Sequence, residues 1–570
     1  MAHRWMLSEP SAHREALMAL INVPGVIAQI LINRGVLTFD DARRFLKPRL
    51  DDLHDPFLMQ DMDKAVDRMA TALQRHEPVM VFGDYDVDGT TSTALLYLVL
   101  RGLSDRVSFY IPDRLQEGYG LSERGIDEAE RRGSSLIIAV DCGITATREI
   151  DLARTAGIDV IVVDHHQPGD RLPDALALLN PKRPGCPYPF KDLCGVGLAY
   201  KVAQALAARL DLPQEIVETH LDLVALGTAA DIVPLQGENR VLVKHGLEEL
   251  QYSQKPGLRA LITAAGLSDK ELSTSQVVFG LAPRLNAAGR MGDASRGVRL
   301  MITTDADEAA RLAEELNAEN RRRQQQDELV FFEARTLVEQ DACLREAKGL
   351  VLASDRWHPG VIGIVASRMV EAFCRPAVMI AVEGQVGRGS ARTMGDFHLY
   401  DALKACSDLL VRFGGHRHAA GLTIRADRID ALRERFNDVV SERTTPADFI
   451  PRLPIDAEIA FQEIDARLIK LLKMLSPFGP DNRQPVLVAR DLTLASVPSI
   501  IGSDRTHLKF RVEQHGRTLE AIGFGMASCA EQLRSQPQGL QLAFTLEENT
   551  WNGTTSFQLR VKDIKTGTDA

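Results

Sequence analysis

The sequence lacks a long hydrophobic run, paired cysteines and a surplus of positive charge. No apolar stretch approaches the ~18–20 residues that cross a membrane, and the first ten residues are polar, so we expect neither a membrane span nor a signal peptide. The seven cysteines are scattered without a CxxC pair, which favours free thiols in a reducing compartment, with the cytoplasm as the default location. The phosphate-binding loop G-x-x-x-x-G-K-S/T is absent, which excludes a nucleotide-driven motor.

Charge does not by itself identify a ligand. With 67 basic and 78 acidic residues, the 570-residue chain has a formal net charge of −11, which is not typical of a nucleic-acid-binding protein. A net charge averages over domains, however, and four basic clusters occur: Arg284, Arg290 and Arg296; Arg321, Arg322 and Arg323; Arg388 and Arg392; His416, Arg417 and His418. We interpret the Arg321 cluster as a solvated helix face, whereas the clusters flanked by glycines indicate a ligand.

The pattern of apolar residues changes along the chain, whose length indicates about three to five domains. Residues 1–77 show the spacing of short helices, as in 26–31 and 65–69. From residue 78 strand-like and helix-like segments alternate, which is typical of a doubly wound parallel α/β sheet. The expected strands are 78–82, 107–111, 135–140, 160–163 and 177–179, and the expected helices include 92–103, 145–156, 197–210 and 214–228.

Two further regions follow this α/β pattern. Residues 305–338 are highly charged and contain no Pro or Gly, so we expect one long helix that connects two lobes. A smaller α/β pattern begins near residue 349, and short alternating segments beyond a linker at 444–448 predict a small β-barrel of the OB-fold kind. The expected domains are a helical extension (1–77), an α/β domain (78–302), a connecting helix (303–345), a smaller α/β domain (346–443) and an OB-fold-like barrel (452–566).

Acidic and histidine side chains follow three of the expected strands: Asp84, Asp86 and Asp88 after 79–82; Asp141 after 136–140; Asp164, His165 and His166 after 160–163. In an open α/β sheet, ligands bind at the carboxyl ends of the strands. Asp231 is expected to approach the same place from the end of a helix. Clustered carboxylates repel one another, and oxygen ligands mixed with imidazole suit Mn²⁺ or Mg²⁺ better than Zn²⁺. The pattern therefore predicts a two-metal site that activates water to hydrolyse a phosphate ester.

Two simpler interpretations compete with a two-metal site. The series D-x-D-x-D-G at 84–89 superficially matches a calcium-binding EF-hand, but Leu95 stands where that loop needs Glu, and a strand precedes it. The series is better explained as a strand-to-helix turn, in which Gly89 turns the backbone and a hydroxyl at 90–92 caps the helix. An adjacent histidine pair more often satisfies local hydrogen bonds than binds metal. Here, however, the pair follows its strand at the same position at which acids follow the other strands.

Taken together, the motifs resemble those of the DHH phosphoesterases. The four ordered motifs are DYDVDG at 84–89, DCG at 141–143, DHH at 164–166 and GTAAD at 227–231. Further matches are PRLNAAGRMG at 283–292 and WHPGVIG at 357–363, then GRGSAR at 387–392 and FGGH at 413–416 in the accessory lobe called DHHA1. A single DHH triplet is weak evidence, but this ordered set is specific. Within the superfamily, the chain is similar over nearly its whole length to the bacterial exonucleases specific for single-stranded DNA. The segment SPFGPDN at 476–482 departs from the Gly-Asn-Pro type common in that group, and we expect it to pack the barrel onto the core.

The resemblance implies an active site in the cleft between the DHH and DHHA1 lobes. It also implies cleavage of single-stranded DNA from the 5′ end and release of mononucleotides with two Mn²⁺ or Mg²⁺ ions. The implied metal ligands are Asp86, Asp88, Asp141, His165 and Asp231, with Asp141 as the bridge between the ions. Asp84 would ligate one ion or orient its water. His166 would contact the scissile phosphate.

Other residues are candidates for holding the substrate. Arg284, Ser390, Arg392 and His416 are proposed to bind phosphates, because Arg offers bidentate charged hydrogen bonds and neighbouring glycines allow close approach. Arg284 and Arg392, each expected in a glycine-containing loop, would clamp a terminal phosphate one nucleotide from the metals. For Arg284 a structural salt bridge is the alternative. Tyr119 would stack on a terminal base, with a packing role equally credible.

Two other functions remain open at this level. One is another DHH-type hydrolase, acting on pyrophosphate, short oligonucleotides or cyclic dinucleotides, although such enzymes commonly need only two lobes. The other is a non-catalytic replication scaffold, although every expected metal ligand is present. For an exonuclease in DNA repair and recombination, the expected partners are single-stranded DNA, a helicase and a single-strand-binding protein. We expect a monomer with no membrane contact.

Overall fold

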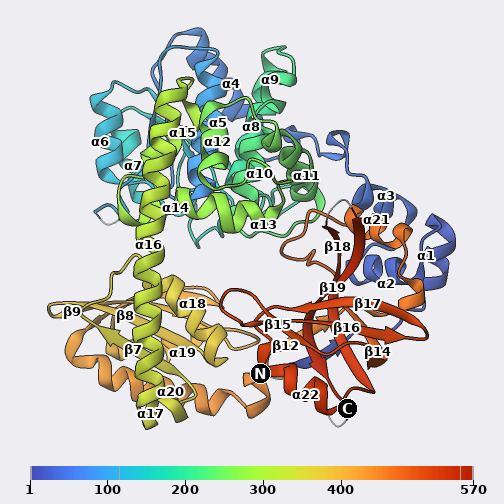
Figure 1. Ribbon diagram of the computed structural model, residues 1–570. Coiled ribbons are helices and arrows are strands. Elements are labelled where there is room, and N and C mark those ends of the chain that lie inside the picture. Colours follow the sequence, from blue (N-terminus) through green and yellow to red (C-terminus); the bar gives the residue numbers. More distant parts are fainter. Residues whose placement is uncertain (1–2, 115, 552–553, 568–570) are drawn as a thin grey trace. The chain divides into compact units, whose positions relative to one another are not determined.

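The computed structural model describes residues 3–114, 116–551 and 554–567 of the chain, and Figure 1 shows its helices and strands. The chain forms two compact units. The larger unit consists of residues 5–285, 294–312 and 453–570, and the smaller unit consists of the first four residues, 286–293 and 313–452. Helix α16 (Ala306–Gln340) is one continuous helix of 35 residues, which confirms the long helix expected from the uninterrupted charged stretch.

A five-stranded parallel sheet organises the larger unit. Its strands have the order β3-β2-β4-β5-β6, and each is paired in parallel with its neighbours. They are β2 (Val79–Gly83), β3 (Val107–Tyr110), β4 (Leu136–Val140), β5 (Asp159–Val163) and β6 (Ala177–Leu179). Strands β2 and β4 are buried along their whole length, as a sheet covered on both faces requires. The doubly wound parallel sheet predicted from the sequence is therefore confirmed.

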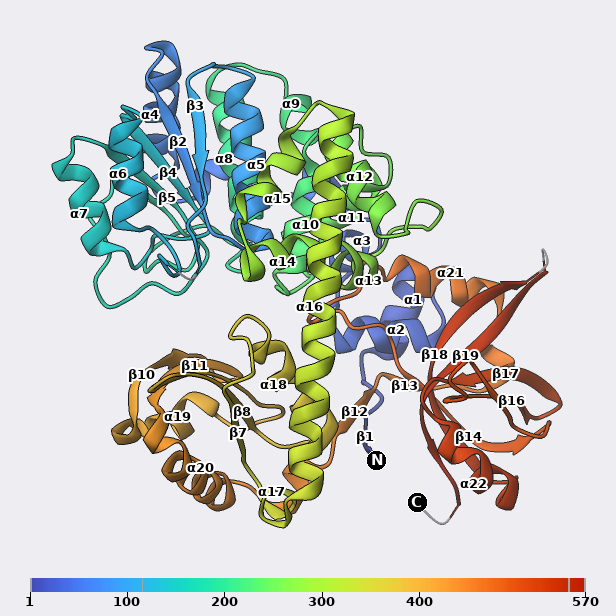
Figure 2. The ribbon, with the colours of Figure 1, turned by 60° about the vertical axis from the view of Figure 1, so that its left-hand side comes forward.

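Helices cover both faces of this sheet. Figure 2 shows α6 (Glu123–Arg131) and α7 (Thr147–Thr155) on one side, and α5 (Val87–Arg101) and α8 (Gly195–Arg209) on the other. Apolar residues of α6 and α7 share one core with alternate residues of the strands. The remaining helices of this region are α9 (Glu215–Glu218), α10 (Leu221–Ala230), α11 (Gly237–Gln251), α12 (Pro256–Ala264), α13 (Thr274–Gln276), the π-helix η3 (Val277–Leu281), α14 (Ala282–Met291) and α15 (Ser295–Ile302).

The C-terminal region is a barrel, as the OB-fold prediction requires. Seven strands have the order β13-β14-β18-β19-β17-β16-β15, and an additional pairing of β14 with β16 joins the two sides. They are β13 (Ala457–Glu458), β14 (Leu487–Leu494), β15 (Ser499–Ile501), β16 (His507–Gln514), β17 (Arg517–Gly523), β18 (Leu540–Trp551) and β19 (Thr554–Lys565). Helices α21 (Ala466–Met474) and α22 (Ala530–Ser535) accompany them.

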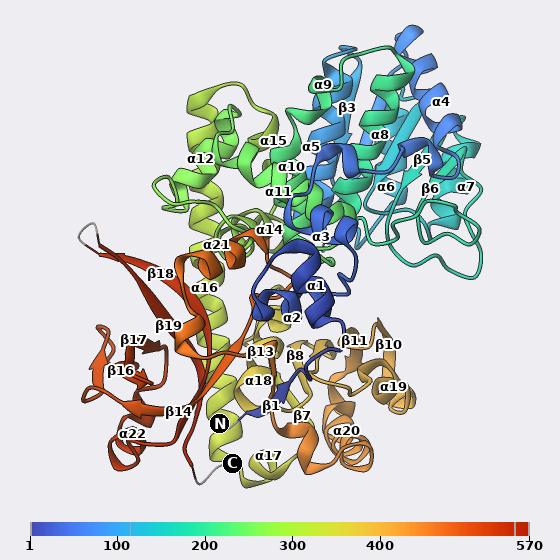
Figure 3. The same ribbon diagram turned by 90° about the vertical axis from the view of Figure 1, so that its right-hand side faces the viewer.

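The N-terminal helices share a hydrophobic core with the barrel. This segment contains β1 (Arg4–Leu7), α1 (Arg14–Ile21), α2 (Gly25–Asn33), α3 (Phe39–Leu46) and α4 (Met62–Gln74). One cluster of buried side chains runs from Leu17 through Phe45 and continues with barrel residues such as Phe510 and Phe544. Figure 3 shows α1 and α2 beside α21 and β13. Residues from the two ends of the chain therefore form one packed body, which the sequence pattern did not predict.

The smaller unit is built on a mixed sheet with the order β10-β11-β9-β8-β7. Its strands are β7 (Leu350–Ser354), β8 (Ala377–Glu383), β9 (Val386–Arg392), β10 (Leu410–Gly415) and β11 (Ala419–Arg425), and only β7 and β8 are parallel. Helices α16 and α18 (Ile362–Phe373) pack on one face, and α19 (Leu399–Lys404) and α20 (Ile429–Arg443) on the other. Helix α17 (Ala342–Glu346) follows α16 in this unit. Strand β12 (Arg452–Ile455), most of which belongs to the larger unit, pairs with β1.

The structure corrects some expected boundaries. The predicted helix 214–228 is two helices, α9 and α10, because the chain leaves helical geometry between them around His220. Helix α5 begins at Val87, five residues earlier than expected. Among the residues described here, no single helix is long and apolar enough to cross a membrane, and α1 and α2 pass such a test only as a pair bent by 112°.

Candidate active site

The sheet places the predicted acids at one edge of the larger unit. Asp84 follows β2, Asp141 follows β4, and Asp164 with His165 follows β5. The first strand, β2, lies between β3 and β4, so the chain order reverses between β2 and β4. Such a reversal opens a crevice at the carboxyl ends of the two strands, where α/β sheets bind ligands. Asp84 and Asp141 stand on either side of that crevice.

The turn from β2 into α5 fixes three carboxylates. Asp86 caps α5, because its side chain accepts a hydrogen bond from the Gly89 amide at 3.0 Å. The predicted hydroxyl cap is therefore wrong: the hydroxyls of Thr90 and Thr91 lie inside the helix and donate to carbonyls of the preceding turn. A Cβ atom at Gly89 would lie 2.6 Å from the carbonyl oxygen of Asp84, so the turn requires glycine there for close backbone approach rather than for a positive φ.

The N-terminus of α8 holds the third of these carboxylates, which belongs to Asp88. Both of its oxygens accept backbone hydrogen bonds, from the amides of Gly195 at 2.6 Å and Val196 at 2.7 Å. A Cβ atom at Gly195 would lie 2.7 Å from the Asp141 side chain, so this position needs glycine as well. Asp141 itself has φ = 59°, in the left-handed region that Asp tolerates better than most residues. The sequence motifs gave no sign that α8 reaches the site.

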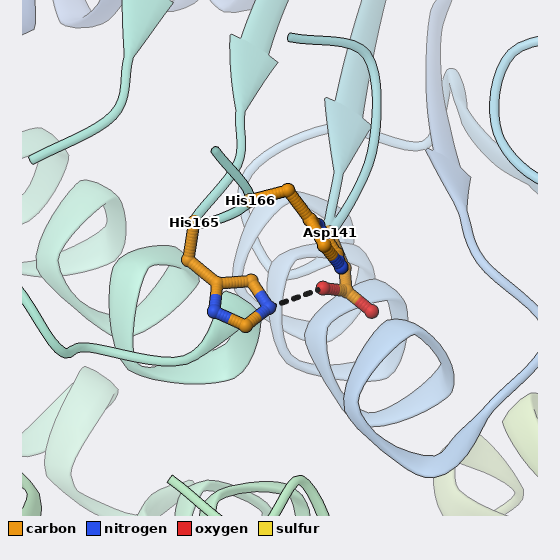
Figure 4. Close-up of side chains that lie close together, drawn as sticks. All are labelled: Asp141, His165 and His166. Atoms are coloured by element: carbon orange, nitrogen blue, oxygen red, sulfur yellow. Dashed lines mark ion pairs between the residues drawn. The ribbon is translucent and has the colours of Figure 1, made fainter. Parts of the chain in front are cut away.

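His165 lies at the centre of the cluster. Its Nε2 atom is 3.2 Å from Asp141 Oδ1, 3.7 Å from Asp231 Oδ2 and 3.8 Å from Asp88 Oδ2, and Figure 4 shows the first of these contacts. Asp231 reaches the cluster from the C-cap of α10, as expected. The side chain of His165 is only 9% exposed, whereas that of its neighbour His166 is 41% exposed. The two histidines therefore face different surroundings, and only His166 is open to a large ligand.

Asp164 positions His166. One oxygen of Asp164 accepts hydrogen bonds from the His166 amide at 3.0 Å and from its Nδ1 at 2.7 Å, and the other accepts from the Ile144 amide at 2.9 Å. Burial alone would lower the pKa of His166, but the bond to Asp164 and its charge raise that pKa above its ordinary value. The Tyr119 hydroxyl lies 3.0 Å from His166 Nδ1 and 3.1 Å from the Asp141 carbonyl oxygen. Its location at the site agrees with the prediction, while stacking on a base stays a prediction.

Several buried polar atoms of the cluster have no hydrogen-bond partner among the described residues. They are Asp84 Oδ1, Asp141 Oδ1, both ring nitrogens of His165, and Asp231 Oδ2. A buried acceptor without a partner costs about 1–3 kcal/mol, and more when it is charged. Atoms of three trios also lie within 4.8 Å of one another: Asp84, Asp86 and Asp141; Asp88, His165 and Asp231; Asp141, His165 and His166. Asp141 and His165 each belong to two of these trios, and the bridging role of Asp141 stays a prediction.

The electrostatics of the cluster favour the binding of a cation. Burial, then repulsion from Asp86, raises the pKa of Asp88 to about 7. Burial, then repulsion from Asp88, raises the pKa of Asp231 to about 9. Burial lowers the pKa of His165 to about 3, so its ring is neutral and can offer a lone pair. A set of oxygen donors with one neutral imidazole fits Mn²⁺ or Mg²⁺, whose charge would offset the repulsion.

A second candidate site lies in the smaller unit, around the end of β9. The Arg392 guanidinium donates to Ser390 Oγ at 3.1 Å and to the Ala391 carbonyl at 2.8 Å. A Cβ atom at Gly363 would lie 3.0 Å from Ser390 Oγ and 3.2 Å from the Arg392 guanidinium. Since Gly363 is the second residue of α18, these groups gather at a helix N-terminus, a setting that favours anions. Predicted together from the sequence, Ser390 and Arg392 are thus adjacent in the structure.

His416 belongs to the same end of this sheet. It follows β10, and its amide donates to the carbonyl of Ala419, the residue that pairs with Arg392 across β11 and β9. Gly415 before it has φ = 145°, and a Cβ atom there would lie 2.4 Å from the Ala419 carbonyl, so the turn requires glycine. Arg392 ends a strand rather than lying in the expected loop, because the GRGSAR segment pairs along its length with β8 and β11.

Arg284 behaves differently from the other predicted phosphate ligands. It lies in the first turn of α14 rather than in a loop, because PRLNAAGRMG is helical up to Met291. Its guanidinium donates to the carbonyl of Gly280 at 2.5 Å and to that of Ala264 at 3.4 Å. These bonds to backbone carbonyls are structural contacts, and both the salt bridge and phosphate binding by Arg284 stay predictions. The exposed Arg321 pairs with Glu314 on α16, in keeping with a solvated face.

Comparisons with known families match three parts of the chain. Residues 78–228 match the N-terminal domain of the DHH family, 346–442 match the DHHA1 domain, and 455–563 match the RecJ OB domain. The three strand-end motifs lie in the first of these segments, and the fourth motif, at the end of α10, begins there, although Asp231 itself lies just beyond its end. The groups around Ser390 and Arg392 lie in the second.

Several relatives are similar over nearly the whole chain. The single-stranded-DNA-specific exonuclease RecJ of Bacillus subtilis is 40% identical over 563 residues, covering 98% of this chain and 70% of the relative. The protein of that name from Escherichia coli is 34% identical, covering 95% of this chain and 96% of the relative. The crystal structure of RecJ from Thermus thermophilus in complex with Mn²⁺ matches with a TM-score of 0.84 and 32% identity, covering 99% of this chain and 79% of that one. The Mg²⁺ complex of that protein matches with a TM-score of 0.79.

Proposed function

This chain belongs to the RecJ family, and we infer from that membership and from the strand-end cluster that it is a metal-dependent exonuclease specific for single-stranded DNA. The finer proposal is 5′-to-3′ degradation with release of 5′-mononucleotides, in DNA repair and recombination. The observation that carries the enzymatic proposal is the buried cluster of acids around His165, whose unpartnered atoms fit divalent cations. A decayed, non-catalytic scaffold would not keep this costly arrangement intact.

We propose two ions, Mn²⁺ or Mg²⁺, held by Asp86, Asp88, Asp141, His165 and Asp231, with Asp141 between them. When bound, such ions lower the pKa of water and stabilise the attacking and leaving oxygens of a phosphate ester. The backbone amides of α8 fix the Asp88 carboxylate, so its oxygens need little reorganisation before a cation binds.

The remaining residues at the strand ends act on the substrate. Asp84, buried with one oxygen unpartnered, is proposed to ligate one ion or orient its water. His166, held by Asp164, is proposed to contact the scissile phosphate or stabilise its charge, and its raised pKa favours that role. Tyr119 has its hydroxyl within hydrogen-bond distance of His166 and a half-exposed ring, which suits a contact with the terminal nucleotide.

Recognition of the 5′ end is assigned to the smaller unit. Arg392, Ser390 and the N-terminus of α18 together offer a charged fork, a hydroxyl and backbone amides, which is the donor set that a terminal phosphate requires. His416 at the same end of the sheet is proposed to contribute a further contact. Because an end phosphate is recognised by its charge and not by a base, this site gives polarity without sequence preference.

We assign strand affinity to the barrel and propose a helicase and a single-strand-binding protein as partners, with the enzyme acting as a monomer. In the barrel, the Phe524 ring is half-exposed and lies under the Arg560 guanidinium at 5.0 Å, an arrangement suited to stacking with bases. A cytoplasmic location is proposed because all seven cysteines are free thiols.

The alternative is a DHH phosphodiesterase for short oligonucleotides or cyclic dinucleotides. One experiment separates the two. The protein is incubated with 5′-labelled and 3′-labelled single strands and with a dinucleotide, each with and without Mn²⁺, and the first product is identified. Release of a labelled mononucleotide from the 5′-labelled long strand supports the proposal. Hydrolysis of the dinucleotide alone supports the alternative, and release from the 3′ label first would reverse the assigned polarity.

A further inference from the structure

A groove in the larger unit begins beside the metal-binding cluster. It has a volume of about 560 Å³, and its lining includes Ile232, Ser275, Phe478, Arg483 and Gln484. Ile232 directly follows Asp231, so one end of the groove lies next to a proposed metal ligand. Arg483 and Gln484 stand just before β14, so the other end leads to the segment that enters the barrel.

Ile232 has an unusual conformation. It is 65% exposed and has φ = 61°, a left-handed geometry that is strongly disfavoured for a β-branched side chain. Such strained residues persist where the surrounding structure enforces them, and they gather at ligand sites. Here the strain leaves an apolar side chain uncovered at the mouth of the groove, immediately after the acid cluster.

The opposite wall of the groove is rigid. Arg240 on α11, 2% exposed, donates to the carbonyls of Leu475, Ser476 and Pro477. Asn482 closes the turn, because its side-chain amide donates to the carbonyls of Leu475 and Pro477. Segment 476–482 is therefore held in place before any ligand binds. The expectation that it packs the barrel onto the core is consistent with these contacts.

The chemistry of the lining differs from that of the cluster beside it. The ten lining residues include four hydroxyl side chains, one amide and one guanidinium, and no carboxylate. In a chain with a net charge of −11, a lining that has one guanidinium and no carboxylate, next to a group of five acids, favours an anion. Hydroxyls and a guanidinium along a track, with an apolar side chain at its mouth, suit the sugar–phosphate backbone of a single strand.

We propose that this groove carries the backbone of single-stranded DNA on the side of the scissile phosphate away from the recognised end, from the metal-binding cluster towards the barrel. The proposal rests on the proposed function, since it needs a polymeric substrate. It assigns Arg483 and Ser275 to the nucleotides beyond the one being removed. These residues are positioning residues, so they act on strand binding and not on the chemical step.

Two substitutions with matched controls test the groove. Ser275→Glu places a carboxylate in the groove, and Ser268→Glu places one at an equally exposed serine of the same unit that is outside it. Arg483→Ala removes the cation of the groove, and Arg101→Ala removes an exposed arginine at the far end of the 15-residue helix α5, roughly 20 Å from the acids at its start. All four positions are exposed, so folding is expected to be retained, and thermal unfolding of each variant checks it.

The measured quantities are kcat and KM for a long 5′-phosphorylated strand and for a 5′-phosphorylated dinucleotide. For the long strand, Arg483→Ala and Ser275→Glu are expected to raise KM about tenfold or more, the effect of losing one charge-assisted hydrogen bond, while kcat stays near wild type. Hydrolysis of the dinucleotide, which ends before the groove, is expected to stay unchanged. Binding of the long strand is also measured with the full chain in the presence of a chelator. A plot of log Kd against log salt concentration should have a slope that is smaller by about 0.7 in Arg483→Ala than in the wild type.

The outcomes separate failure of the groove from failure of the enzymatic function. A wild-type protein that degrades no single strand overturns the proposed function itself. A wild type that degrades long strands, with Arg483→Ala and Ser275→Glu matching their controls, overturns the groove alone. Equal losses on the long strand and on the dinucleotide also overturn it, because the two residues would then act at the scissile phosphate.

Discussion

The cluster at the strand ends and the group around Arg392 bind charge in opposite ways. In the cluster, five acids that are buried or half-buried surround a neutral imidazole, and several of their atoms have no hydrogen-bond partner among the described residues. The pKa of Asp231 rises to about 9. Around Arg392, a guanidinium, a hydroxyl and a helix N-terminus lie on a partly exposed strand end. The first arrangement is unfavourable until a cation binds, whereas the second is stable alone and can exchange an anion rapidly. An exonuclease needs both: a resident metal and a chain end that leaves after each cut.

The largest expected effect comes from the cluster. Asp141→Ala should lower kcat by more than about a hundredfold at saturating Mn²⁺, because changes to groups that merely support metal ligands already cost about tenfold to a hundredfold. Steady-state degradation of a 5′-phosphorylated strand measures it. The metal-free variant should melt no lower than the wild type, since removing one acid relieves repulsion, and the exposed Asp127→Ala serves as the matched control. More than about a tenth of wild-type activity in Asp141→Ala would exclude the bridging role.

The strand ends could be predicted from the sequence because buried parallel strands have a strong apolar signal, and their carboxyl ends coincide in space. Asp84, Asp141 and His165 follow such strands directly, so their convergence needed no further information. The contribution of α8 could not be predicted, since Gly195 and Val196 act through backbone amides, which have no residue signature.

Contacts between segments far apart in the sequence could not be predicted from sequence patterns either. Nothing local in 1–77 indicates that its helices complete the barrel core, yet Phe45 and Phe544 belong to one cluster. Deleting the barrel would therefore expose the N-terminal helices, so point variants test its role better than truncation. The helical state of Arg284 was missed because glycines at 289 and 292 read as loop signals, although α14 tolerates Gly289 in its interior.

The second prediction uses the pKa shifts of the cluster. Asp88 and Asp231 have raised pKa values of about 7 and about 9, so without metal the folded state favours their protonated forms. The two carboxyls then stabilise the folded state fully at a pH below about 4, the pKa of an Asp in the unfolded chain. This stabilisation is lost as the pH rises through their folded-state pKa values towards 9. Metal binding displaces these protons, so the gain in Tm on adding Mg²⁺ should grow from pH 6 to pH 8.5. At a concentration a hundredfold above Kd, the free energy of unfolding should rise by about 2.7 kcal/mol.

Differential scanning calorimetry of the full chain, with and without Mg²⁺, measures this gain across the pH range. Asp231→Asn supplies the control, because it removes a carboxyl whose pKa is raised to about 9 and should flatten the pH dependence of the metal-free protein. A Tm gain that does not change with pH would show that the acids are ionised before the metal arrives.

The third prediction moves to the smaller unit. Arg392→Ala should erase most of the preference for 5′-phosphorylated over 5′-hydroxyl strands, because a charge-assisted hydrogen bond contributes about 1.5–3 kcal/mol. This corresponds to roughly a tenfold to hundredfold loss in kcat/KM for the phosphorylated strand alone. Activity on the 5′-hydroxyl strand should change little, as should metal binding followed by calorimetry. The exposed Arg321→Ala is the control.

The smallest effect is expected for Arg284, which lies in the larger unit. Its substitution tests whether recognition of the terminal phosphate is confined to the smaller unit. Its guanidinium donates to the carbonyls of Gly280 and Ala264, so Arg284→Ala removes about two hydrogen bonds, worth about 1 kcal/mol each. We expect a lower Tm with the 5′-phosphate preference retained, measured as the ratio of kcat/KM on the two strands. Arg284→Lys keeps the positive charge but not the two-pronged guanidinium. Its Tm should lie between that of the wild type and that of Arg284→Ala. If Arg284→Ala instead loses the phosphate preference as Arg392→Ala does, the clamp predicted from the sequence is correct, and anion recognition belongs to both units.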